Sequence, residues 1–193
     1  MRWAVRLAIV CATLLCSWPQ CARADVERFA LIVGDNKGTA GDTDLHYAEA
    51  DASKLYDVLK DLGGFEPADM VLLRGENSAT AIRTLIALND RIRTAISRPG
   101  TDVLLFVYFS GHADSTALHM SGSRFDLSQL EQLVRGSAAT FRILMLDACR
   151  SGALTRVKGG QTAPPFSISV GEHLTGEGLA FLTSSSANED AQE

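Results

Sequence analysis

Long hydrophobic runs are scarce in this chain of 193 residues, and none is long enough to span a bilayer as a helix. The longest run that precedes the folded part, residues 7–15, follows a basic start at Arg2 and Arg6. A small-residue A-x-A signal at residues 22–24 comes next. This three-part pattern predicts a cleaved secretory signal peptide over residues 1–24, with an uncleaved membrane anchor as the alternative. We therefore expect a secreted or periplasmic domain over residues 25–193, without stable membrane insertion after cleavage.

Cysteine is nearly absent from that expected domain. Three of the four cysteines, Cys11, Cys16 and Cys21, lie in the predicted signal peptide, and Cys149 alone follows it. An exported chain with one thiol has no intrachain disulfide partner. Cys149 is therefore either a small buried hydrophobic residue or a reactive group.

Basic residues are also few. Without residues 1–24, fifteen Lys and Arg face 23 Asp and Glu, a formal net charge of −8. This charge opposes binding to nucleic acid, so no nucleic-acid partner is predicted. His46, His119 and His173 have no Cys or His partner at metal-binding spacing, and we predict no metal site.

Apolar strand patterns alternate with amphipathic helix patterns along the domain. This alternation predicts an α/β fold with a mostly parallel sheet and helices on both faces. Strands are expected at 29–34, 69–73, 102–109, 141–146 and 179–183, helices at about 46–62, from 77 or 78 to 96, and after 126, and a small hairpin at 116–125. Asp126 with Gln129 predicts a capping box for the third helix. The last strand is expected near an uncovered edge of the sheet.

Two of the apolar strands are followed directly by polar residues. His112 follows one of them and Cys149 follows another, 37 residues later. Ligands of α/β sheets bind at the carboxyl ends of strands, so both groups are expected at one edge of the sheet. A thiol needs a nearby base to become a nucleophilic thiolate, and an imidazole can supply it. Alone, each residue could instead be structural.

Two motifs around these residues resemble a known family. YFSGHAD at 108–114 and LDACRSG at 146–152 resemble the histidine and cysteine motifs of caspase-like cysteine peptidases, closest to bacterial metacaspase or orthocaspase-like proteins. LIVGDNKG at 31–38 and residues 45–65 resemble the first strand and first helix of that branch. The resemblance implies a caspase-like three-layer fold. It also implies that the chain is truncated at its C-terminus, since a further strand and helices normally follow in that family.

The resemblance also assigns catalytic roles. It implies Cys149 as nucleophile, His112 as general acid and base, and an oxyanion hole formed by the backbone N–H groups of Ala113 and Cys149. The family normally has glycine where this chain has Ala113. If that position needs a positive φ, alanine is strained there and hydrolysis is weakened.

Charge predicts the specificity. In metacaspases three residues that match Asp147, Ser110 and Asp51 line the substrate pocket, and an acidic pocket favours Lys or Arg at the cleavage position. The alternatives are a cap of the following segment for Asp147, a turn residue for Ser110 and a solvated helix residue for Asp51. Arg156 and Lys158 lie in a Gly- and Pro-rich loop and are predicted self-cleavage sites, or else ordinary solvated residues.

The leading prediction is therefore an exported caspase-like cysteine endopeptidase that cleaves protein or peptide substrates after Lys or Arg. The alternative is a catalytically weak or inactive module of the same fold that binds or regulates. No cofactor is predicted. A calcium requirement is suggested by the family resemblance alone, because no calcium-binding loop is recognisable in the sequence.

Overall fold

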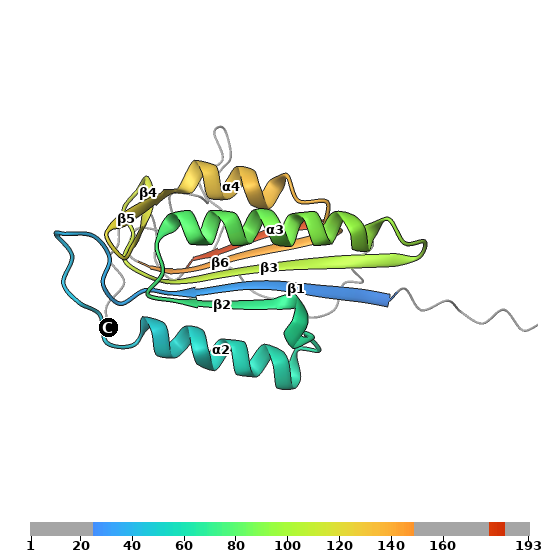
Figure 1. Cartoon of the computed structure of the whole chain (residues 1–193), viewed down its shortest axis with the longest axis horizontal. Helices are drawn as coiled ribbons and strands as arrows, with labels where there is room; N and C mark the ends of the chain where they lie inside the picture. The colour runs from blue at the N-terminus through green and yellow to red at the C-terminus, as the bar shows by residue number, and fades with distance from the viewer. Residues whose placement is uncertain (1–24, 149–177, 184–193) are drawn as a thin grey trace, which may run out of the picture.

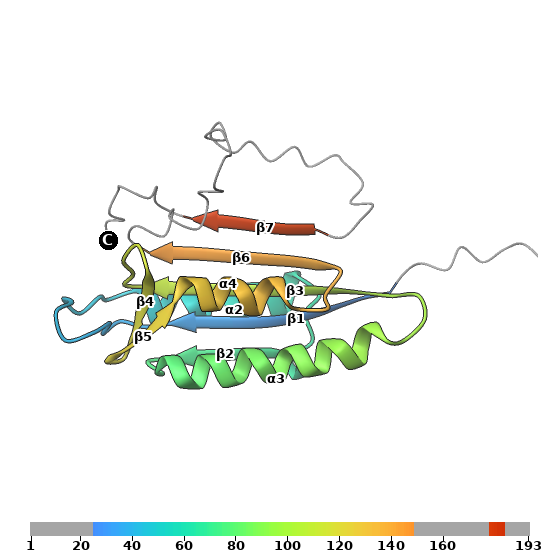
Figure 2. The ribbon, with the colours of Figure 1, turned by 90° about the horizontal axis from the view of Figure 1, so that it is seen from above.

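Five parallel strands form the middle layer of the computed structural model, which describes residues 25–148 and 178–183. They lie in the order β2-β1-β3-β6-β7 (Figure 2). Their bounds are β1 (Asp25–Gly34), β2 (Met70–Arg74), β3 (Thr101–Gly111), β6 (Phe141–Ala148) and β7 (Gly178–Thr183). All neighbouring pairs are parallel, so every strand ends at the same edge of the sheet.

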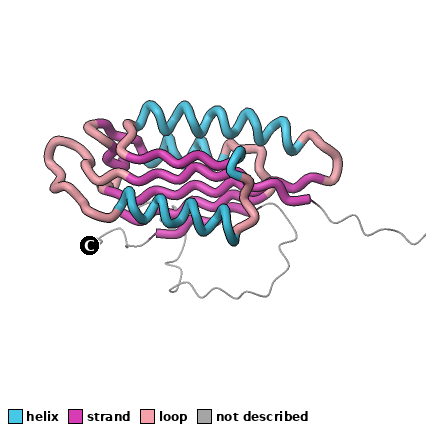
Figure 3. Tube along the Cα trace, turned by 60° about the horizontal axis from the view of Figure 1, so that its bottom comes forward, coloured by secondary structure: helices cyan, strands magenta, loops and turns pink. Residues whose placement is uncertain are grey.

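Helices cover both faces of this sheet (Figures 1 and 3). Helix α2 (Ala48–Leu62) lies on one face, and α3 (Ser78–Ile96) and α4 (Leu127–Arg135) lie on the other. A short 3₁₀ turn, η1 (Pro67–Asp69), leads into β2. The predicted α/β architecture is confirmed. Among the described strands, β7 is at the edge, as expected.

Alternation along the central strands sorts the core into two clusters. In β3, Leu105, Val107 and Phe109 pack toward α3 and α4. Phe106 and Tyr108, which alternate with them, pack toward α2. Successive side chains of a strand point to opposite faces. Because both faces are covered, the strand is apolar along most of its length, which is why its pattern was readable in the sequence.

A two-stranded hairpin stands at the carboxyl end of the sheet, formed by β4 (Ala117–Met120) and β5 (Ser123–Asp126) (Figure 1). Ser121 and Gly122 connect the strands with φ values of 41° and 80°. Two positive φ values are typical of the two-residue turns that match strand twist. The predicted hairpin is confirmed.

Other boundaries differ from the prediction. β1 begins at Asp25 because residues 25–28 pair with residues 101–104, although polar side chains obscure the strand pattern there. β6 continues through Asp147 and Ala148, which pair with Ser110 and Gly111, so these residues belong to the strands rather than to the loops after them. The capping box is wrong: Asp126 precedes α4, but its side chain makes no capping hydrogen bond. Asn77 does cap α3, accepting from the Thr80 amide at 3.0 Å.

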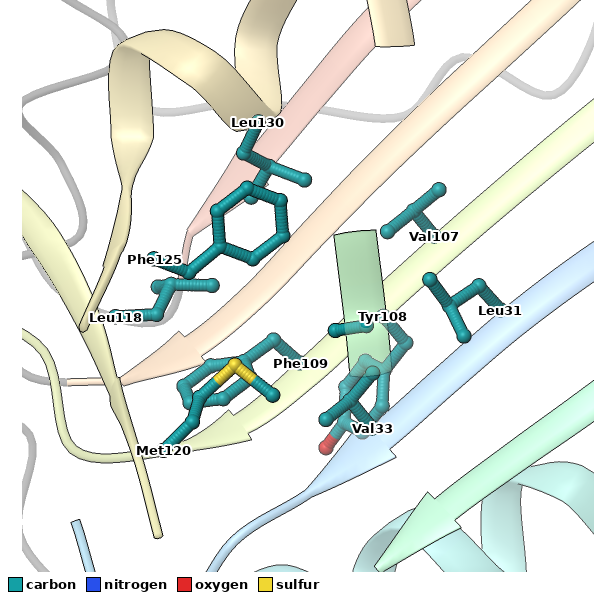
Figure 4. Close-up of a pocket in the computed structure, with 10 residues that line it drawn as sticks. Leu31, Val33, Val107, Tyr108, Phe109, Leu118, Met120, Phe125 and Leu130 are labelled. Carbon is teal, nitrogen blue, oxygen red and sulfur yellow. The ribbon is translucent and has the colours of Figure 1, made fainter. Parts of the chain in front are cut away.

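The core is closely packed. A void of about 10 Å³ lies where the hairpin meets the sheet (Figure 4). It is lined by apolar side chains, among them Leu118, Met120 and Phe125. A space of that size holds about one water-sized sphere, so it is a packing gap and not a substrate site. None of the described helices is both long and apolar enough to cross a membrane.

Candidate active site

Of the two predicted catalytic residues, the structure describes His112, at the end of a strand that neighbours β6. β3 and β6 pair in register, with Ser110 opposite Asp147 and Gly111 opposite Ala148. His112 follows Gly111 at once. Cys149, the predicted nucleophile, follows Ala148 in the sequence and lies outside the described residues.

The imidazole of His112 is half-buried and held by the loop after β1. Its Nε2 lies 2.7 Å from the carbonyl oxygen of Thr43. A carbonyl oxygen accepts hydrogen bonds and cannot donate, so Nε2 carries the proton. In the neutral ring this leaves Nδ1 with its lone pair, as a general base requires. Thr43 was not predicted, because a backbone carbonyl leaves no mark in a sequence.

Ala113 sits in a short antiparallel bridge with Leu118. The hydrogen bonds of this bridge are those from the Asp114 amide to the Ala117 carbonyl and from the His119 amide to the His112 carbonyl. These bonds flank Ala113, so neither uses its N–H. Ser121 is the one non-glycine residue with positive φ in the described ranges 25–148 and 178–183. The backbone strain anticipated at Ala113 therefore does not arise here.

The three predicted substrate-binding residues lie on the α2 side of the sheet. Ser110 shares a strand face with Tyr108, two residues earlier, and Asp147 is paired with Ser110. Asp147 is exposed and Ser110 is 5% exposed. Asp51, in the first turn of α2, makes an ion pair with Lys54 at 2.9 Å, as a solvated helix residue would.

Tyr108 connects these residues and was missed by the sequence analysis. Its hydroxyl lies 3.5 Å from Asp147 Oδ2. Burial, followed by the negative charges of Asp147 and Asp51, raises the pKa of the Tyr108 phenol to about 12, although a hydrogen bond with Ser110 acts in the opposite direction. One phenol is thus sensitive to all three predicted residues. Its spacing of two from Ser110 was the signal that could have revealed it.

The remaining predictions concern metals and processing. The described ranges hold no group of three or more His, Cys, Asp or Glu arranged around a common point where a metal could bind. Asp42 and Asp114, which lie in the loops near the site, instead bind the ring of His119. Arg156 and Lys158, the predicted self-cleavage sites, lie outside the described residues, as does the predicted signal peptide.

The described residues form a parallel α/β sheet with His112 after β3, and Cys149 follows β6 in the sequence, an arrangement that suits a cysteine peptidase-like domain. Comparison with known families identifies it further: the caspase domain model matches residues 27–192. The chain belongs to the caspase domain family. The sequence has no significant match among curated proteins.

Solved caspase structures share this fold. Caspase-1 from Spodoptera frugiperda superposes with a TM-score of 0.55 at 16% identity, covering 83% of this chain and 62% of the caspase. A structure of pro-Sf-caspase-1 gives a TM-score of 0.51 at 15% identity with the same coverage. The chain thus spans less than two thirds of the length of the caspases that it matches. Both similarities concern the fold, and a closer relation to metacaspases stays a prediction.

Proposed function

We propose that this protein is an exported cysteine endopeptidase that cleaves after Lys or Arg, using Cys149 and His112. The observation that carries the proposal is the hydrogen bond from His112 Nε2 to the Thr43 carbonyl, one residue beyond the Gly111–Ala148 pair. This hydrogen bond occupies Nε2, so the basic Nδ1 faces away from Thr43. Cys149 follows the end of the neighbouring strand, β6, in the sequence. Membership of the caspase domain family supports the same chemistry.

The proposed reaction proceeds by acyl transfer. His112 Nδ1 takes the proton of the Cys149 thiol, and the thiolate attacks the scissile carbonyl carbon. The backbone N–H groups of Ala113 and Cys149 stabilise the resulting oxyanion. The C–N bond breaks, and His112 returns the proton to the leaving amine. Water, deprotonated by His112, then attacks the thioester, releasing the carboxylic acid and restoring the thiol.

Charge supports the specificity for a basic residue. Asp147 is exposed, and both it and Asp51 act electrostatically on Tyr108, so two carboxylates share one side of the strand end. The Tyr108 hydroxyl, with its pKa near 12, stays a hydrogen-bond donor or acceptor without charge at working pH. A cationic side chain is attracted to such a site, while an acidic one is repelled.

The test is a panel of fluorogenic peptides that differ at the cleavage position, with Arg, Lys, Ala or Asp. We expect turnover of the Arg and Lys peptides and none of the Asp peptide. Cys149→Ala and His112→Ala should each abolish it. Absence of turnover by the wild type, together with binding of Arg peptides, would instead favour the catalytically weak binding module. Backbone strain at Ala113 does not favour that alternative, because Ala113 has no positive φ.

Self-cleavage at Arg156 and Lys158 follows from the proposed specificity. Mass spectrometry of the purified wild type should find termini after these residues, and Cys149→Ala should stay intact. An intact wild-type chain would refute self-cleavage. Sequencing the N-terminus of exported protein tests the signal peptide, for which Asp25 is the expected first residue.

A further inference from the structure

A buried histidine outside the proposed catalytic pair links two segments of the site. His119, on β4, is 9% exposed. Its Nδ1 lies 2.7 Å from Asp42 Oδ2, and its Nε2 lies 3.1 Å from Asp114 Oδ2 and 3.1 Å from Arg124 Nη1. Asp42 belongs to the loop after β1, whereas Asp114 and Arg124 belong to the hairpin region. The imidazole therefore connects that loop to the hairpin.

The proton on the loop side of this ring can be assigned. Hydrogen bonds from the Thr39 amide and hydroxyl, at 2.6 and 2.8 Å, also end on Asp42 Oδ2. Burial opposes ionisation of Asp42, but these bonds and His119 outweigh it and hold the pKa of the carboxyl below its usual value. A carboxylate only accepts, so His119 Nδ1 donates. At Nε2 two arrangements are possible, since a neutral ring accepts from Arg124 and a protonated ring donates to Asp114.

These contacts close a ring of bonds around His112. The His119 amide donates to the His112 carbonyl at 2.8 Å. The His119 side chain holds Asp42, the residue before Thr43. The Thr43 carbonyl in turn accepts from His112 Nε2 at 2.7 Å. One residue thus fixes both the backbone of His112 and the acceptor of its ring.

We propose that His119 is a positioning residue, whose Nδ1–H bond to Asp42 holds the Thr43 carbonyl in place and thereby keeps His112 in the Nε2–H tautomer. The proposal rests on the proposed role of His112 as general base. Other bonds fix the rest of the loop: Asp35 accepts from the Gly38 amide at 2.6 Å, and the Leu45 amide donates to Asn36 at 2.7 Å. Loss of the His119 bond should therefore free the Thr43 carbonyl without unfolding the domain.

Two amide substitutions distinguish the role of His119 Nδ1 from that of Nε2. In His119→Asn the amide nitrogen can take the place of Nδ1, whereas in His119→Gln it reaches the place of Nε2. We expect His119→Asn to keep the bond to Asp42 and His119→Gln to lose it. Asp42→Asn weakens the same link from the other element, because all three donors end on the charged Oδ2 and a neutral amide oxygen is a poorer acceptor. It keeps the test usable if His119→Gln does not fold.

The test has two readouts that need no peptidase activity. Long-range ¹H–¹⁵N spectra of the imidazoles report the His112 tautomer, and iodoacetamide, with peptide mass spectrometry, reports the alkylation rate of Cys149. In wild type and His119→Asn we expect His112 in the Nε2–H form. In His119→Gln and Asp42→Asn we expect mixed His112 tautomers and an alkylation of Cys149 that is slowed about tenfold. In peptide turnover, kcat should fall while KM stays unchanged, since the substrate-binding residues are elsewhere.

Unchanged His112 spectra and alkylation in both His119→Gln and Asp42→Asn would overturn the proposal. Equal changes of the His112 tautomer and of Cys149 alkylation in His119→Asn and His119→Gln would also overturn the proposal, because they would show that the His119 ring acts by packing. If the wild type turns over no peptide but the His112 tautomer depends on residue 119 as described, the proposed function fails and the positioning role stands.

Discussion

At the scale of single residues, two carboxylates near the site are held in their ionised form. Burial opposes the ionisation of Asp114, but hydrogen bonds from Thr116 and Arg124 outweigh it and lower the pKa of this carboxyl. The pKa of Asp42 is lowered in the same manner by Thr39 and His119. The bond between Asp42 and His119 ties the loop that carries Thr43 to the hairpin, and the bonds of Asp114 hold the hairpin region together. The ionisation of both residues therefore stabilises the folded site.

This ionisation predicts a loss of stability in acid. A folded-state pKa below the unfolded value of 3.8 contributes stability above that pH, and the contribution disappears as the pH falls through the folded pKa. We expect the melting temperature to decline progressively below about pH 4. Asp114→Asn should lower stability at pH 7 by roughly 1 kcal/mol, a value reduced for solvent screening of a partly exposed group, and flatten this decline. Circular dichroism melts from pH 7 to 2.5 test this, and parallel curves for both proteins would contradict it.

Tyr108 gives a spectroscopic measure of the acidic site. Its phenol should titrate near pH 12, because burial and the charges of Asp147 and Asp51 disfavour the phenolate. Absorbance titration of the wild type minus that of Tyr108→Phe isolates this group. Asp147→Asn should lower its apparent pKa. An unchanged titration in Asp147→Asn would place the Asp147 carboxylate away from Tyr108.

The sequence predicted residues with distinctive chemistry but not their supports. His112, Asp147 and Ser110 stood out because polar residues interrupt apolar strands. Thr43 acts through a carbonyl, which any residue possesses. His119 offers no such mark in the sequence, because its partners Asp42 and Asp114 are brought to it by folding and do not stand at a recognisable spacing.

At the scale of elements, β1 and the start of α2 approach each other closely at Gly34. A Cβ atom on Gly34 would lie 2.6 Å from the Ala48 carbonyl oxygen and 2.7 Å from Glu49 Cα. Both are backbone atoms of the start of α2, which cannot move aside cheaply. The glycine thus sets how near α2, with Asp51 in its first turn, comes to the strand ends.

Gly34→Ala should therefore displace α2 and destabilise the fold. We expect a loss of about 1–3 kcal/mol, as for other overpacked sites, and a lower melting temperature. Gly41→Ala is the matched control, because a Cβ there has no atom within 4 Å. Equal melting temperatures for the two variants would contradict the close contact. The accompanying KM for Arg peptides should rise in Gly34→Ala alone.

Element types near the site followed from the sequence, whereas the strand ends did not. The apolar cores of β3 and β6 were readable, and both carboxyl ends were expected at one edge of the sheet. Their last residues, Ser110 with Gly111 and Asp147 with Ala148, are polar or small, so pairing across the sheet and not hydropathy extends both strands. Pairing between distant residues is invisible to local patterns.

At the scale of the whole molecule, three layers bring together residues from four parts of the chain. The loop after β1, the start of α2, and the ends of β3 and β6 meet at one edge of the sheet (Figures 1 and 2). The net charge of −8 expected for residues 25–193 adds a general attraction for basic substrates. Local charge at Asp147 should supply the selectivity.

Asp147→Asn tests that selectivity. A hydrogen bond to a charged group contributes about 1.5–3 kcal/mol, so kcat/KM for Arg and Lys peptides should fall roughly 10- to 100-fold. Asp57→Asn is the control, because it changes the net charge by the same amount. Asp57 is an exposed residue of α2 that pairs with Lys60. Equal effects of the two substitutions would attribute the preference to overall charge and not to Asp147.

Labelling by a peptide chloromethyl ketone tests most directly whether His112 activates Cys149 beside an acidic pocket. With Arg at the reactive position, peptide mass spectrometry should find one adduct, on Cys149, that is absent from His112→Ala and formed far more slowly by the corresponding Asp ketone. Failure of Cys149 to react, or equal labelling by the Arg and Asp ketones, would contradict the account.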